Sequence, residues 1–282
     1  MIDPTARPTL DRLRAQCAQL IGPGPVETVA SGLSAALLHG LWLPTWAADR
    51  RVDLTVWSDL RASRALLRPQ GGAVDVHRRQ LRAQDVTVVA GVPVTTLERT
   101  WFDLAAVLDV PDLVAAGDSA LRAGDANGSA SMESLAEVCR EYRNRRGARR
   151  AVTALAMLDA RSRSRPESHL RVALRHPDLP EFAVNEAVAD DNGEWLAEPD
   201  LSLREAKLAL EYQGSDHADP ERMRKDMTRI ADLRRNGWQV LLYGPAEVFQ
   251  RPQLIAPEVR AILRTRAPQL LIPRRGRTRA AS

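Results

Sequence analysis

Two acidic residues in the second half of the chain, Asp200 and Glu211, have the type and spacing to bind a metal ion. Side chains of an extended strand alternate between its two faces, so Glu211 would share a face with Gln213. A two-residue hairpin turn at 205–206 would place Asp200 directly opposite Glu211, and such pairs have Cβ atoms about 4.5–5.5 Å apart. Two carboxylates this close repel each other unless a cation lies between them, and hard oxygen ligands favour Mg²⁺ (or Mn²⁺).

A metal ion at this pair would hold a phosphate oxygen, activate a water molecule and stabilise a leaving oxygen. We therefore expect Asp200 and Glu211 to be metal ligands in a site that hydrolyses phosphodiester bonds. Glu211 interrupts an apolar segment in which Leu208, Leu210 and Tyr212 fill the opposite face of the strand. In the structural alternative, Glu211 is only a polar residue on the solvated face of an edge strand.

Glu167 is the third acidic candidate. It shares a helix face with Leu170 and Leu174, so its carboxylate could reach the metal site from the buried side. It also fits a capping box in which Ser164 is the N-cap and Glu167 follows three residues later, a role that requires no catalysis. Both interpretations remain open.

Gln213 and His217 complete the candidate catalytic residues. Gln213 could orient a water molecule beside the carboxylates. His217 lies in the loop after the predicted strand, where it could be a proton shuttle or a phosphate contact. Equally, it could be a loop histidine that caps the following helix.

The elements around these residues alternate between helix and strand. Residues 164–176 and 220–236 are predicted helices, and the segments 182–188, 195–203, 207–213 and 238–243 are predicted strands. This order indicates an α/β/α domain with a central mixed sheet, in which helices cover a three-strand meander. Trp195, Trp238 and Tyr243 are expected to be core aromatic residues.

Basic residues near this site could hold a DNA backbone. They are Arg165 at the helix start and a stripe of Arg222, Lys225 and Arg229 along the second helix. Further arginines cluster within 140–150 and 274–279, where they could neutralise phosphates. A solvated helix face and a basic tail would have the same composition, so this alternative stays open.

Several segments of the second half resemble endonuclease-like domains related to the very-short-patch mismatch repair endonucleases. The resemblance covers about residues 160–265 and rests on Arg165-Pro166-Glu167-Ser168-His169-Leu170-Arg171, Glu198-Pro199-Asp200-Leu201, Leu210-Glu211-Tyr212-Gln213-Gly214 with His217, and Arg224-Lys225-Asp226 to Gly237-Trp238-Gln239-Val240-Leu241. It implies a restriction-endonuclease-like PD-(D/E)xK fold, the core of metal-dependent DNA nucleases. It also implies that Asp200 and Glu211 are metal ligands and that Glu167 is an accessory acid.

One position departs from the motif of these nucleases, because Gln213 stands where they have a lysine. Lysine would stabilise the developing negative charge or the attacking hydroxide, whereas glutamine can only orient a water molecule. Lys207 on the same strand face or Lys225 on the following helix could compensate. Otherwise the site is weak or inactive, and the chain would be a DNA-binding regulator without turnover.

The first half is predicted to be an α+β region. Helices are expected at 10–20, 31–40, 96–108, 111–122, 132–143 and 147–160, strands at 51–56, 74–77 and 86–89, and a turn at 91–93. No catalytic constellation is found among these residues. His39 and His77 have no partners at metal-ligand spacing, so we interpret both as structural.

Residues of about 28–122 resemble actinobacterial proteins of the AbiEi-like antitoxin family. The matching segments are Ser34-Ala35-Ala36-Leu37-Leu38-His39-Gly40-Leu41-Trp42-Leu43-Pro44, Val74-Asp75-Val76-His77-Arg78, and Gly91-Val92-Pro93-Val94-Thr95-Thr96 with Arg99-Thr100 and Asp103-Leu104-Ala105. The resemblance implies a regulator of toxin-antitoxin type. A homodimer or a protein partner could form through this part of the chain.

Composition limits the class of protein and its compartment. With 282 residues, 44% hydrophobic and 27% charged, the chain is typical of globular domains and unlike disordered or fibrous proteins. No apolar run approaches the ~20 residues of a membrane helix, and no secretory signal is expected, so we expect a cytoplasmic protein. Cys17 and Cys139 have no metal-type spacing and are expected to be incidental thiols.

These observations predict five segments. They are an N-terminal helix and linker (1–27), an AbiEi-like α+β domain (28–125), a basic helical linker (126–160), a nuclease-like α/β/α domain (161–267) and a basic tail (268–282).

Overall fold

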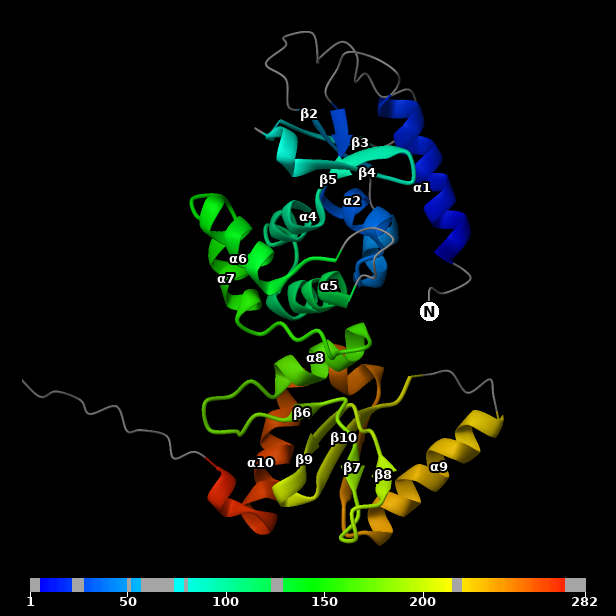
Figure 1. Ribbon diagram of the computed structural model, residues 1–282, viewed down its shortest axis with the longest axis vertical. Helices are drawn as coiled ribbons and strands as arrows, with labels where there is room; N and C mark the ends of the chain where they lie inside the picture. Colours follow the sequence, from blue (N-terminus) through cyan, green and yellow to red (C-terminus); the bar gives the residue numbers. More distant parts are fainter. Residues whose placement is uncertain are drawn as a thin grey trace, which may run out of the picture. The chain divides into compact units, whose positions relative to one another are not determined.

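The computed structural model describes residues 6–21, 28–49, 52–56, 74–78, 81–122, 129–214 and 220–271. In these ranges the protein is mixed α/β, with helices packed against mixed sheets (Figure 1). The chain divides into two compact units, Met1–Ala160 and Arg161–Ser282. The division falls where the sequence predicts the start of the nuclease-like domain.

The first unit is built on a five-stranded sheet in the order β3-β2-β1-β5-β4. Its strands are β1 (Thr28–Ala30), β2 (Val52–Val56), β3 (Val74–Arg78), β4 (Val86–Val89) and β5 (Val92–Thr95). The central strand β1 is antiparallel to β2 and parallel to β5. The sequence predicts β2, β3 and β4, but it does not predict β1 or β5.

The expected turn at 91–93 is wrong in position. Ala90 and Gly91 form the turn, with φ of 48° and 80°, and Val92 already pairs with Val89. Two consecutive positive φ angles are typical of the tight hairpin turn whose twist matches that of the flanking strands. Pro93 conceals this strand in the sequence, because proline is uncommon inside sheets.

Helices of the first unit agree with the sequence in position, but four of them end earlier than expected, two by one or two residues and two by four or five. They are α1 (Ala6–Ile21), α2 (Gly32–His39), α4 (Leu97–Leu104), α5 (Val110–Arg122), α6 (Met132–Glu141) and α7 (Ala148–Leu155). Cys17 of α1 packs with Leu38, Leu54 and Val94 in the core beside the sheet. Cys17 and Cys139 are both free and buried.

Both histidines singled out in this half contact backbone or side-chain groups of the fold. The Nε2 atom of buried His39 lies 2.8 Å from the carbonyl oxygen of Thr95. That of His77 lies 3.0 Å from Oδ1 of Asp53, whose Oδ2 accepts a hydrogen bond from the backbone of Leu33 in the first turn of α2. These contacts support the structural interpretation of both residues.

The second unit contains a four-stranded mixed sheet in the order β11-β10-β9-β6. Its elements in chain order are α8 (Arg165–Ala173), β6 (Ala183–Val184), β7 (Val188–Ala189), β8 (Trp195–Ala197), β9 (Leu201–Leu203), β10 (Leu208–Tyr212), α9 (Pro220–Arg235), β11 (Gln239–Tyr243) and α10 (Ile255–Arg266). Strand β10 is antiparallel to β9 and parallel to β11.

Helices cover both faces of this sheet. Leu208 and Leu210 of β10 pack with residues of α8 and α10 in one apolar cluster. Ala209, on the opposite face, packs with Ile230 and Leu233 of α9 in a second cluster. The alternation of β10 therefore separates two cores, with α8 and α10 on one side of the sheet and α9 on the other (Figure 1).

The predicted strand over 195–203 is in fact two short strands, β8 and β9, which belong to different sheets. The break falls at Pro199, which has no N–H group to donate to a ladder. The predicted strand over 182–188 likewise corresponds to two short strands in different sheets, β6 and β7. Trp238 and Tyr243 are buried as expected, but Trp195 is 65% exposed at the start of β8, so the core assignment of this tryptophan is wrong.

Candidate functional site

Three acidic residues of the second unit converge where β9 begins and β10 ends. The ladder pairs Leu201 with Leu210, so Asp200 stands opposite Glu211 when the same register is continued by one residue. This register is the one predicted from the sequence. The connection is longer than predicted, because a 3₁₀ turn at Arg204–Ala206 and a left-handed Lys207 (φ 43°) replace a two-residue turn.

Asp200 is held by the neighbouring strand and carries a perturbed carboxyl group. Its Oδ2 atom accepts a hydrogen bond of 2.8 Å from the backbone N–H of Tyr212. Burial, helped by the negative charges of Glu167 and Glu211, raises the pKa of Asp200 to about 7, although the Tyr212 N–H and the positive charge of Arg229 oppose the change. A buried acid surrounded by other acids is typical of sites that act on charged ligands.

Glu167 lies in the first turn of α8 with only 8% of its surface exposed. Ser164 is the N-cap, and its hydroxyl donates to Oε1 of Glu167 at 2.8 Å, while the backbone N–H of Arg163 donates to Oε2 at 2.7 Å. The capping role is therefore confirmed, in a variant form in which Glu167 accepts from the residue before the N-cap. Capping does not remove this carboxylate from the site, because its charge still raises the pKa of Asp200.

Asn185, which the sequence reasoning missed, connects two of these acids. Its side-chain Nδ2 donates to Oε2 of Glu167 at 2.8 Å, and its backbone N–H donates to the carbonyl oxygen of Asp200 at 3.0 Å. Its φ of 49° is left-handed, a conformation that asparagine adopts more readily than most residues. The isolated asparagine after an apolar strand was the available signal, but nothing in the sequence indicates its partners.

Glu211 is 5% exposed on β10 and forms an ion pair with Arg229 of α9. The guanidinium Nη1 donates to Oε1 and Nη2 donates to Oε2 at 2.8 Å, so both carboxylate oxygens face one planar cation. Nη2 also lies 3.4 Å from Asp226. The structural alternative, in which Glu211 is a residue on a solvated face, is therefore wrong: the carboxylate is buried and paired.

Gln213 and Lys207, the predicted catalytic glutamine and a possible replacement for the motif lysine, have their described contacts with groups other than the three acids. Gln213 is exposed just beyond β10, and its backbone N–H donates to the carbonyl oxygen of Tyr243 at 2.9 Å. Lys207 contacts Asp191 at 2.9 Å and the carbonyl oxygen of Asn236 at 3.2 Å, so it is engaged at the β9–β10 turn. His217 lies outside the described residues.

Of the predicted DNA-binding residues, two have described side chains. The Arg165 guanidinium lies 4.5 Å from the ring centroid of Phe249, and Arg229 is engaged by Glu211. Holding a phosphate with Arg229 would require that ion pair to open. The side chains of Arg222 and Lys225 on α9 are not among those described, and these DNA contacts stay predictions.

The acidic residues can be compared with the ligands that a divalent cation needs. No group of three His, Cys, Asp or Glu side chains placed to hold a metal is found in the described part of the chain. Mg²⁺ is commonly bound by one or two carboxylates, with water and substrate phosphates as its other ligands. Asp200 and Glu211 are two carboxylates of this type, and a cation bound by Glu211 would have to displace the Arg229 guanidinium that now holds both of its oxygens.

Comparisons with known proteins give relatives but no function. The chain is 29% identical over 195 residues to two proteins of Mycobacterium tuberculosis, "Uncharacterized protein MT2308" from strain CDC 1551 and "Uncharacterized protein Rv2248" from strain H37Rv. The alignment covers 68% of this chain and 69% of each relative. No family model matches the chain, and no solved structure matches it significantly.

No helix in the described residues is long and apolar enough to cross a membrane.

Proposed function

We propose that the second unit hydrolyses phosphodiester bonds of DNA with a divalent cation, Mg²⁺ or Mn²⁺. The observation that carries the proposal is the group formed by buried Glu167, buried Glu211 and partly buried Asp200, in which neighbouring negative charges help to raise the pKa of Asp200 to about 7. Acids this close together repel one another, and Arg229 offsets part of that repulsion by pairing with Glu211 and lowering the pKa of Asp200. A divalent metal bound by these acids would reduce their repulsion, and it would also supply the charge needed for phosphodiester hydrolysis.

The chain's own residues have distinct parts in this proposal. Asp200 and Glu211 hold the cation, and the Tyr212 N–H keeps the Asp200 carboxylate in place. Glu167, fixed by its capping contacts, adds negative charge, and Gln213 orients a water molecule. The cation, when bound, would polarise the phosphate and activate that water.

The fold proposed for this unit is restriction-endonuclease-like. In its favour, the antiparallel pair β9 and β10 brings the two acids together, with Asp200 directly before β9 and Glu211 in β10. Strand β11 adds a parallel strand beside β10, and helices cover both faces. A helix with an acid in its first turn, α8, precedes the sheet. This is the order of elements that the resemblance to very-short-patch repair endonucleases implies.

The first test is metal binding by calorimetry, with Mn²⁺ titrated into the full chain at pH 8. We expect one site that is lost in Asp200→Asn and in Glu211→Gln and kept in Asp191→Asn, whose side chain is 88% exposed. Equal binding by all four proteins would refute the proposed ligands.

A second candidate function is a DNA-binding regulator of antitoxin type without turnover. It is favoured because, among the side chains that the structure describes, no free lysine lies at the acidic residues: Gln213 stands at the motif position, and Lys207 pairs with Asp191. In addition, Arg229 pairs with Glu211, one of the proposed metal ligands. Such a regulator would bind DNA equally well with and without a chelator. The nuclease would lose its metal-dependent step when the chelator is added.

A further inference from the structure

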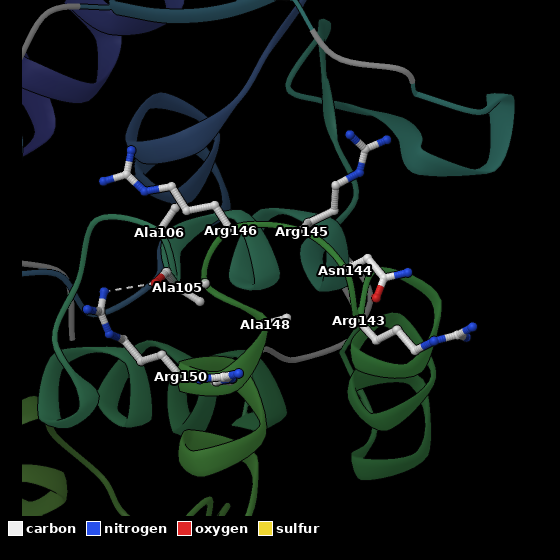
Figure 2. A pocket seen from close by; sticks show the side chains of 10 residues that line it. Ala105, Ala106, Arg143, Asn144, Arg145, Arg146, Ala148 and Arg150 are labelled. Carbon is white, nitrogen blue, oxygen red and sulfur yellow. Dashed lines mark hydrogen bonds between the residues drawn. The ribbon is translucent and has the colours of Figure 1, made fainter.

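The first unit contains a basic pocket that no part of the proposed function uses. It has a volume of about 410 Å³ and lies between the turn after α4 and the loop that leads into α7 (Figure 2). The turn contributes Ala105 and Ala106, and the loop and first turn of α7 contribute residues 143–150. The pocket is therefore formed by two segments that lie far apart in the sequence.

The wall of this pocket depends on one glycine. Gly147 has φ of 91°, and a Cβ atom built there would lie 2.7 Å from the carbonyl carbon of Ala105. Only glycine allows the two backbones to approach this closely. Arg150 stabilises the same contact. Its Nη1 donates to the carbonyl oxygen of Ala105 at 2.9 Å (Figure 2) and to that of Leu108 at 2.7 Å. The pocket is preorganised by these contacts.

Four further arginines line the pocket: Arg143, Arg145, Arg146 and Arg149. All four are exposed, and within the described residues none of their side chains has a hydrogen bond or an ion pair. In Figure 2, the side chains of Arg145 and Arg146 both extend upward from the loop, with their guanidinium groups directed apart. This differs from the second unit, where Arg229 and Arg260 are engaged by carboxylates.

The electrostatic balance of the pocket is one-sided. Its lining contains no Asp or Glu, so nothing in the pocket compensates the guanidinium charges. Helix α7 also starts here, with Gly147 as an N-cap that offers no side-chain hydrogen bond, and the positive end of the helix dipole adds to the potential. Like charges gathered at one place repel, and an anion relieves that repulsion.

The lining also limits the kind of anion. Guanidinium groups match the geometry of phosphate oxygens and bind them through two parallel hydrogen bonds. The lining has no aromatic side chain on which a base could stack, and Asn144 is its only side-chain amide. A ligand held here would be recognised by its phosphates and not by its bases.

We infer that this pocket, through lining residues that include Arg145 and Arg146, binds phosphate groups of a double-stranded DNA backbone without regard to sequence. This site is independent of the proposed hydrolysis, because it lies in the other compact unit and uses none of the acidic residues. It would give the chain an affinity for DNA that persists without metal.

The test is DNA binding by the full chain, measured by fluorescence anisotropy with a labelled duplex in EDTA over a range of salt concentrations. The variant is Arg145→Gln/Arg146→Gln. The control is Arg12→Gln/Arg264→Gln, which removes the same charge at two exposed arginines outside the pocket. Asp200→Asn is measured in parallel.

We expect the pocket variant to bind at least about tenfold more weakly and to lower the slope of log K against log salt by about 1.8, since each lost phosphate contact removes about 0.9. The control should change both quantities much less. Equal losses in the two double variants, or no loss in either, would overturn the inference. If the pocket variant loses affinity only for inorganic phosphate, the ligand is a small anion and the DNA assignment is wrong.

The same data separate this inference from the proposed hydrolysis. Wild-type binding in EDTA, retained by Asp200→Asn, supports the pocket whether or not the second unit cleaves DNA. Failure of cleavage with intact pocket-dependent binding would refute the nuclease alone.

Discussion

The replacement Asp200→Asn probes the most perturbed acid of the candidate site. Asparagine keeps an oxygen that can accept the Tyr212 N–H, and it removes the carboxyl group that can ionise. In the unfolded chain Asp200 titrates near its ordinary pKa of 3.8, whereas burial and the neighbouring acids raise the folded pKa to about 7. The folded protein therefore holds an additional proton between these two values.

The sign and size of the effect follow from this difference. Between pH 4 and 7 the folded state binds more protons than the unfolded state, so the stability of the wild type falls as pH rises. The pKa difference between 3.8 and about 7, at 1.36 kcal/mol per pKa unit, limits this loss in the free energy of unfolding to about 4 kcal/mol. Because the site is only partly buried, we expect a loss of about 2–3 kcal/mol. The asparagine variant has no such loss.

Urea unfolding at pH 4.5 and at pH 8, in EDTA, measures the effect. We expect the free energy of unfolding of Asp200→Asn, relative to wild type, to increase by about 2–3 kcal/mol from the lower to the higher pH. Asp191→Asn, at a side chain that is 88% exposed, should show no such increase. Parallel pH profiles of the wild type and Asp200→Asn would mean that Asp200 is not perturbed, and the electrostatic description of the site would be wrong.

Three other substitutions test the surroundings of the two sites. Arg229→Gln leaves a buried carboxylate unpaired, so it should lower stability by about 2–4 kcal/mol in EDTA, with part of the loss recovered when Mg²⁺ is added during the same urea unfolding. Gly147→Ala should cost at least about 2 kcal/mol in thermal unfolding, because its Cβ would overlap Ala105, whereas Gly91→Ala, which has open space and a similar φ, should cost about 1 kcal/mol. Asn185→Ala removes a hydrogen bond to a buried charge and should cost about 1.5–3 kcal/mol; an unchanged unfolding curve for any of the three would contradict the contacts described.

The sequence predicts the position of the acidic pair because local rules determine it. Strand alternation and the register across a short turn bring Asp200 opposite Glu211, and this holds although the turn is longer than expected. The N-cap at Ser164 is equally local, since it depends on residues three positions apart.

The partners of these residues could not be predicted, because they are set by tertiary packing. Arg229 is 18 residues from Glu211 and reaches it only because α9 packs on that face of the sheet. Asn185 joins Glu167 and Asp200 across two connections that no periodicity reveals. The pocket beside Gly147 is a further case, because its shape depends on a backbone contact 42 residues away in the sequence.

The predicted strands differ from the observed ones mainly where a proline interrupts a segment or where a strand is very short. Pro199 divides one predicted strand into β8 and β9, and Pro93 conceals β5. Strand β1 has only 3 residues, too few for a periodic signal, and it is stabilised by neighbours on both sides.

Cleavage of a supercoiled plasmid in Mg²⁺ or Mn²⁺ tests the central proposal most directly, with wild type, Asp200→Asn, Glu211→Gln and the control Asp191→Asn compared at equal concentration. We predict metal-dependent nicking by the wild type and by Asp191→Asn, and its loss in both variants of the acidic pair. No cleavage by folded wild-type protein that binds DNA in EDTA would contradict the proposed hydrolysis and favour the regulator without turnover.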